Sequence, residues 1–170
     1  MRMNKFNRES LARQYFSPLT NVILVIAVFT ASSVLAQTSD AEVIKQVEAF
    51  LHEYYKGFES EDLNRLTGGV TEDFTAVFYM PGKEKKPIPF DKRGIREGFT
   101  QAIALYKGKK PQMKISQILV LVRSESEAVA SYKMDFYLDG EWKNAALSIS
   151  DLRREGTEWK IYRRYENKWR

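Results

Sequence analysis

Four consecutive stretches with the character of β-strands limit the fold of this chain more than any other feature. They are rich in β-branched and aromatic residues or alternate between apolar and polar types, and they read QMKISQILVLVR, EAVASYKMDFYL, EWKNAALSISDLRR and EWKIYRRYENKW. The links between them are short, and one is the hairpin pair Asp139-Gly140. Strands joined so closely form an antiparallel meander, and the apolar face of that meander has to be covered by other elements.

The third of these stretches carries an acid on an apolar face. Leu147, Ile149 and Asp151 are spaced two residues apart, so their side chains point to the same side of a strand. Two interpretations stay open. Asp151 is either a functional group inside a pocket, or a strand-end acid paired with a neighbouring cation such as Arg153, Arg163 or Lys160.

Helical periodicity dominates the region before the strands. Apolar residues between Val43 and Phe58 recur at three- and four-residue spacing opposite charged ones, which predicts a long amphipathic helix. The sequence SDAE, at 39–42, is a capping box for the start of that helix. The sequence SEDLNRL, at 60–66, predicts a short second helix that ends at Gly68 and Gly69.

Residues 70–106 connect these helices to the meander. The run VTEDFTAVFYM predicts a strand, PGKEKKPIPF a basic, proline-rich surface loop, and the residues between Asp91 and Tyr106 a helix that packs on a sheet. The resulting order is helix, helix, strand, helix and four strands. Helices separated from an antiparallel sheet in this way predict an α+β fold.

The first 36 residues have the pattern of a secretory signal peptide. Basic residues precede the apolar run VILVIAVFTASSVLA, and small or short residues end it before Gln37. We therefore expect cleavage near Ala36 and Gln37, export to the periplasm or the extracellular space, and one domain over residues 37–170. The alternative is an uncleaved N-terminal membrane anchor, because the apolar run approaches the length that spans a bilayer.

Composition excludes several classes of site. The chain has no cysteine and a single histidine, His52, so we expect no cofactor, no thiolate or histidine metal centre and no Ser-His-Asp triad. The chain has 27 basic and 22 acidic side chains, but four of the basic ones lie in the leader. Acidic residues are interleaved with the basic ones near the C-terminus, which argues against nucleic-acid binding.

Three stretches make the chain similar to a known superfamily: YYKGFESEDLNRL, VTEDFTAVF and DLRREGTEWKIY. In this order and spacing they resemble the nuclear-transport-factor-2-like (NTF2-like) superfamily, in particular its SnoaL-like and ketosteroid-isomerase-like branch. The resemblance implies a cone-shaped, curved antiparallel sheet wrapped on about three helices, and it makes a homodimer through the open sheet face plausible. It does not fix the chemistry, because one fold hosts many functions.

Comparison with the ketosteroid isomerases implies three site positions. Their oxyanion-hole tyrosine corresponds to Tyr54, and their protonated aspartic acid, the second oxyanion donor, to Asp151. A phenol and a neutral carboxylic acid can both donate hydrogen bonds to one developing oxyanion. The position of their general base is Phe78, which cannot accept a proton. The resemblance therefore favours a pocket that holds a ligand over a catalytic site.

From these observations we expect an exported domain whose cavity binds a small, mostly apolar molecule. The expected lining residues are Tyr54, Phe78, Tyr79, Phe99 and Asp151. One alternative is an isomerase or lyase with Tyr54 and Asp151 as oxyanion donors and a base taken from elsewhere, for example Asp135. The other is a dimeric interaction module without a functional cavity.

Overall fold

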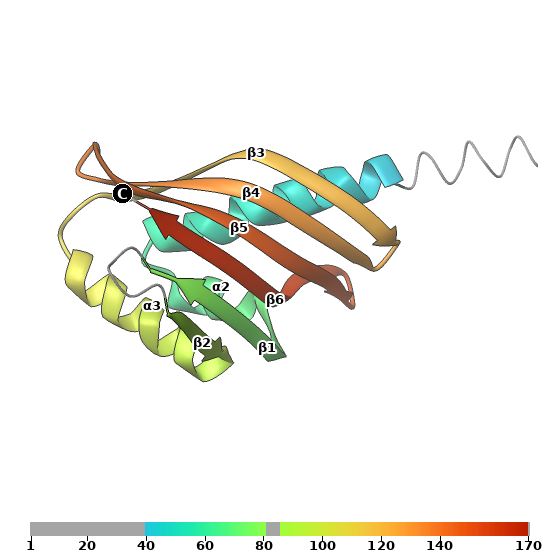
Figure 1. Cartoon of the computed structure of the whole chain (residues 1–170), viewed down its shortest axis with the longest axis horizontal. Coiled ribbons are helices and arrows are strands. Elements are labelled where there is room, and N and C mark those ends of the chain that lie inside the picture. Colours follow the sequence, from blue (N-terminus) through green and yellow to red (C-terminus); the bar gives the residue numbers. More distant parts are fainter. Residues whose placement is uncertain (1–39, 81–85, 170) are drawn as a thin grey trace, which may run out of the picture. The chain divides into compact units, whose positions relative to one another are not determined.

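The structure, a computed structural model, describes residues 40–80 and 86–169 (Figure 1). The first helix occupies residues 40–59 of this part. It is followed by α2 (Leu63–Gly68), β1 (Val70–Tyr79), β2 (Pro87–Asp91), α3 (Lys92–Tyr106), β3 (Pro111–Ser124), β4 (Glu127–Leu138), β5 (Glu141–Glu155) and β6 (Glu158–Trp169). The predicted capping box at Ser39 and the predicted leader lie outside the described residues.

The strands form one curved, open sheet in the order β2-β1-β6-β5-β4-β3. Strands β3 to β6 pair antiparallel in sequence order, so the predicted meander and the α+β class are confirmed. The hairpin between β4 and β5 turns at Asp139 and Gly140, which have φ values of 55° and 85°. Positive φ at both positions is the requirement of the type I′ turn that this residue pair predicts.

Strand β1 lies beside β6 and pairs with it in parallel. This long-range pairing brings the middle of the chain next to its C-terminal strand. Phe78 is the register partner of Glu166, and Tyr79 is the partner of Asn167. Residues of both strands line the candidate site described below.

The prediction that PGKEKKPIPF is entirely loop was wrong for its last residues. Residues 87–91 form β2, which pairs antiparallel with β1. Pro87 and Pro89 fit there because β2 is the outermost strand and is paired on one side only, so an absent N–H on the other side removes no ladder hydrogen bond. Two prolines in a basic stretch indicate a loop, and these residues are recognised as an edge strand only from their pairing with β1.

The two shorter helices begin at acidic caps. The carboxylate of Asp62 accepts a hydrogen bond of 3.0 Å from the backbone N–H of Arg65, so α2 starts at Leu63 and not at the predicted Ser60. Asp91 does the same for α3, accepting from the N–H of Gly94 at 2.7 Å. Within residues 40–80 and 86–169, no helix is both long enough and apolar enough to cross a membrane.

The core lies between the helices and one face of the sheet. The first helix contributes Val47 and Leu51, which are fully buried together with side chains of β4 such as Ala130 and Tyr132. Burial alternates along the strands. In β5, Ser148 and Ser150 are buried, whereas Leu147 and Ile149 are exposed on the opposite side, which we call the outer face.

Candidate functional site

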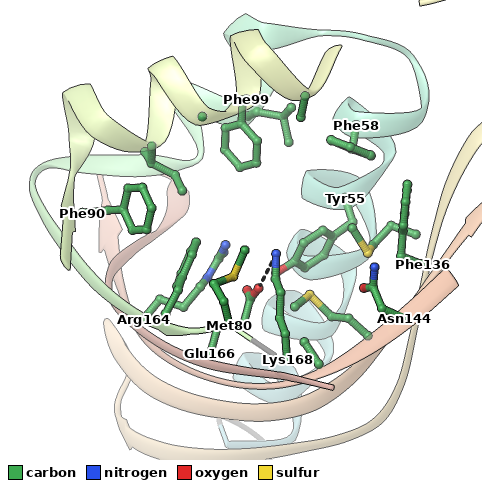
Figure 2. Close-up of a pocket in the computed structure, with 18 of the residues that line it drawn as sticks. Tyr55, Phe58, Met80, Phe90, Phe99, Phe136, Asn144, Arg164, Glu166 and Lys168 are labelled. Atoms are coloured by element: carbon green, nitrogen blue, oxygen red, sulfur yellow. Dashed lines mark ion pairs between the residues drawn. The ribbon is translucent and has the colours of Figure 1, made fainter. Parts of the chain in front are cut away.

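A cavity of about 270 Å³ lies between α3, the first helix and the helix-facing side of the sheet (Figure 2). An apolar cavity of ~150 Å³ is large enough for benzene, so this one has room for a molecule of one or two rings. Most of its wall is apolar or aromatic. The lining side chains are those of Tyr55, Phe58, Leu66, Phe78, Met80, Phe90, Ile95, Phe99, Ala102, Tyr106, Met113, Met134, Phe136, Asn144, Ala146, Arg164, Glu166 and Lys168, and Gly98 adds backbone.

Aromatic rings from separate elements hold the apolar wall in place. Phe58 of the first helix, Tyr106 of α3 and Phe136 of β4 contact one another, with ring centroids 5.3 to 6.2 Å apart. On the other side Phe78 and Phe90 lie 4.9 Å apart. These distances are those of favourable aromatic pairs, so the wall is packed and preformed.

Three charged side chains from β6 form the opposite wall. Arg164, Glu166 and Lys168 alternate along the strand, and Figure 2 shows all three extending from it toward the cavity. Lys168 Nζ lies 3.2 Å from a carboxylate oxygen of Glu166, and these two charges form an ion pair. The same ammonium lies 5.7 Å from the centre of the Phe78 ring.

Arg164 is the most deeply buried of the three, at 2% relative exposure. Its Nε and Nη2 atoms are buried without a hydrogen-bond partner among the described residues. The guanidinium lies against two aromatic rings, 5.2 Å from the centre of the Tyr54 ring and 5.6 Å from that of Tyr55. Such cation–π contacts compensate only part of the hydration that a buried cation loses.

A short chain of hydroxyl groups lies beside these charges. The Tyr55 hydroxyl is 3.0 Å from that of Tyr132, which is 2.9 Å from the Ser150 hydroxyl. Burial raises the pKa of the Tyr55 phenol well above its ordinary value, because the phenolate would lose its hydration. Tyr55 is therefore a neutral hydrogen-bonding group at the cavity wall.

Phe78 and Phe99 line the cavity, as the sequence predicted for both. Tyr79 does not, because it follows Phe78 in β1 and its side chain points to the opposite side, where it is exposed. Figure 2 shows Phe99 on the side formed by α3, facing the β6 charges across the cavity.

Tyr54 lies next to the cavity residue Tyr55 but does not line the cavity itself. Its ring packs against the backbone of Gly69 and against the guanidinium of Arg164. Its hydroxyl is buried without a partner, and burial raises the pKa of this phenol too. Tyr54 therefore supports the cavity wall from outside the cavity, through its contacts with Arg164 and with the Tyr55 ring, whose centre lies 4.9 Å away.

Asp151 shares the outer face with Leu147 and Ile149, although it is buried there and they are exposed, and it does not line the cavity. Its carboxylate pairs with Arg123 at 3.2 Å and with Arg163 at 3.8 Å. Arg163 is one of the cations named in the alternative interpretation of Asp151 as a paired strand acid. Leu147, Ile149 and Asp151 therefore lie on one side of β5, as predicted, but that side does not line the cavity.

Asp135, the base considered in the enzyme alternative, is also absent from the cavity wall. It accepts a hydrogen bond from the Trp142 indole at 3.0 Å and pairs with Lys133 at 2.9 Å. Burial acts to raise the pKa of Asp135, but Lys133 and Trp142 outweigh it and hold that pKa below its ordinary value. The carboxylate in the cavity is instead that of Glu166, in register with Phe78.

Comparison with solved structures shows the NTF2-like fold. An NTF2-like protein of unknown function from Pseudomonas putida has a TM-score of 0.62 and 11% identity, over 75% of this chain and 87% of the other. A candidate scytalone dehydratase from Novosphingobium aromaticivorans has a TM-score of 0.63 and 13% identity, over 79% and 89%. A cystatin-like protein of unknown function from Nostoc punctiforme has a TM-score of 0.59 and 12% identity, over 73% and 89%.

No family model matches the chain, and neither does any curated protein. The fold expected from the resemblance is confirmed by the solved structures. At 11–13% identity this likeness shows the fold alone, so the function has to be argued from the side chains of the cavity.

Proposed function

From the NTF2-like fold and its apolar cavity, we propose that this protein binds a small, mostly apolar molecule between α3, the first helix and the sheet. The observation that carries the proposal is the preformed cavity of about 270 Å³ with its largely aromatic wall. Pockets for small ligands have this composition: apolar surface with a few convergent polar groups. Binding rather than catalysis is favoured because Phe78 stands where the related isomerases have their base.

Glu166 does not reverse this preference. It is a carboxylate inside the cavity, and one of its oxygens forms an ion pair of 3.2 Å with Lys168. A carboxylate acts as a general base only where a substrate places the proton to be removed within hydrogen-bond reach. The cavity therefore supports the holding of a ligand by shape and burial.

The proposal predicts that the full chain binds naphthalene, a neutral apolar probe of the right size, in a saturable manner that can be followed by its fluorescence. Ala102 lines the cavity from α3, so Ala102→Phe fills part of the space and should weaken binding at least about tenfold. Asp151→Asn is the control: because Asp151 lies on the outer face, this variant should bind within about twofold of the unchanged protein.

Two results would contradict the proposal. One is the absence of saturable binding by the unchanged protein. The other is unaltered binding by a folded Ala102→Phe variant, since the probe would then occupy some other place. Thermal unfolding of each variant shows whether it has folded.

A further inference from the structure

The charges of the cavity wall indicate what kind of molecule the cavity accepts. We propose that its ligand is an organic monoanion, a carboxylate on an apolar body of one or two rings, whose negative group lies against Arg164. This inference rests on the proposed function, because it adds the chemical class of the ligand to the same cavity.

The first argument is the charge balance of the wall. The charged side chains among the described lining residues are Arg164, Glu166 and Lys168. Lys168 and Glu166 neutralise each other at 3.2 Å, so one positive charge remains. A ligand with a single negative charge would make the cavity neutral, whereas a neutral ligand would leave that charge uncompensated and a dianion would add an excess.

The second argument is the lack of protein partners for Arg164. An arginine guanidinium is not deprotonated in proteins, and it offers five donors. The Nε and Nη2 atoms of Arg164 are buried without a hydrogen-bond partner, and Glu166, the acid among the described lining residues, forms its ion pair with Lys168. Buried charges are normally paired, so an unpaired one that lines a cavity indicates a binding partner that is absent from the protein itself.

The third argument is the way in which Arg164 is held. The Tyr54 and Tyr55 rings lie beside the guanidinium at 5.2 and 5.6 Å and fix its position, while its Nε and Nη2 atoms have no hydrogen-bond partner. These two atoms can therefore donate to an anion without giving up a hydrogen bond within the protein. Arginine is well suited to this role, because its planar fork matches the two oxygens of a carboxylate.

The wall opposite Arg164 determines the rest of the ligand. Phe99 lies across the cavity from the β6 charges, and Phe58 and Phe136 continue the apolar surface (Figure 2). A molecule whose anionic end lies on β6 would therefore place its apolar body among these rings. Inorganic anions do not fit this division, because they would leave the aromatic wall without a partner.

The test compares two isosteric probes, 2-naphthoic acid and 2-naphthamide, by isothermal titration calorimetry with the full chain at neutral pH. The acid is then ionised, and the amide is neutral. A charge-assisted hydrogen bond is the stronger kind, so we expect the unchanged protein to bind the acid at least about tenfold more tightly than the amide.

Three variants locate the source of that preference. Arg164→Met keeps the length and loses the charge, so the ratio of the two affinities should fall to about one while the amide is still bound. Glu166→Gln removes the nearby negative charge and should increase the preference for the acid. Arg163→Met is the matched control, since Arg163 pairs with Asp151 on the outer face and should leave the ratio unchanged.

The outcomes separate the two proposals. Equal binding of acid and amide by the unchanged protein, or an undiminished preference in Arg164→Met, would overturn the anion inference and leave the apolar ligand in place. If neither probe binds, the proposed function fails as well. If Arg164→Met does not fold, Glu166→Gln decides, because a preference that it leaves the same or lowers contradicts a site beside these charges.

Discussion

Tyr54 owes its position to the absence of a side chain at Gly69. A Cβ atom added at Gly69 would lie 2.4 Å and 2.8 Å from two carbons of the Tyr54 ring, which is far closer than non-bonded carbons approach. The ring therefore occupies the space above the turn between α2 and β1. From there it supports the guanidinium of Arg164, with which it is in cation–π contact.

We predict that Gly69→Ala lowers the free energy of unfolding by about 1–3 kcal/mol, the usual cost of overpacking a filled site. Gly68→Ala is the matched control, because a Cβ there meets nothing within 4 Å and alanine favours a helix end no less than glycine does. Urea unfolding of both variants measures the difference. Equal stability of the two would show that Tyr54 is not held in this way.

The sequence of β5 does not determine which of its two faces points toward the core. Alternation correctly groups Leu147, Ile149 and Asp151, but it does not say which face of the strand is inside. Both faces of β5 carry residues that could belong to a core, because Ser148 and Ser150 are small and Leu147 and Ile149 are apolar. In the structure the two serines are buried, whereas Leu147 and Ile149 are exposed. The expectation that Asp151 lies in a cavity therefore rests on taking its apolar neighbours as the inner face of the strand, and on the family resemblance.

The position of Arg164 in the cavity wall cannot be predicted from the sequence for a related reason. The pairing of β5 with β6 shifts by one residue at Tyr162, because Asp151 faces Arg163 while Leu152 faces Ile161. Such a bulge reverses the parity of the strand. Ile161 and Arg164 thus lie on the same side, although they are three residues apart. Without this register shift, the basic residues of β6 are interpreted as a face exposed to solvent.

Helices and strands are predicted correctly where the pattern that identifies them lies within the element itself or in a short link. The helical periodicity of residues 43–58 and of the segment after Asp91, and the short links of the meander, all identify the correct element. The parallel pairing of β1 with β6 joins segments that are far apart in the sequence, and neither segment carries a sequence pattern that predicts it. The register that places Glu166 beside Phe78 could therefore not be read from the chain.

The outer face of the sheet carries several exposed apolar side chains. Leu121 of β3 and Ile149 of β5 are 65% and 43% exposed, and Leu119, Leu147 and Tyr165 are also exposed on this side. Large apolar patches on a soluble domain commonly mark contact surfaces. The homodimer that the resemblance makes plausible stays a prediction, and this face is where it would form.

The dimer can be tested by sedimentation velocity on the full chain. We expect twice the mass of one chain for the unchanged protein and a shift to the mass of one chain for Ile149→Lys, because a cation in an apolar interface loses its hydration. Leu105→Lys on α3 is the control, since Leu105 is exposed but lies away from the sheet and should leave the mass unchanged. A single-chain mass at every concentration would contradict the prediction.

Binding of a probe inside the cavity can be observed by nuclear magnetic resonance of the methionine methyl groups. Met80, Met113 and Met134 all line the cavity, and they come from three different parts of the chain. On titration with naphthalene we predict that the signals of these three methyl groups shift together with one saturation curve, while the Ile149 methyl on the outer face does not move. Unchanged methionine signals at saturating probe, or a shift confined to Ile149, would show that the cavity is not the binding site.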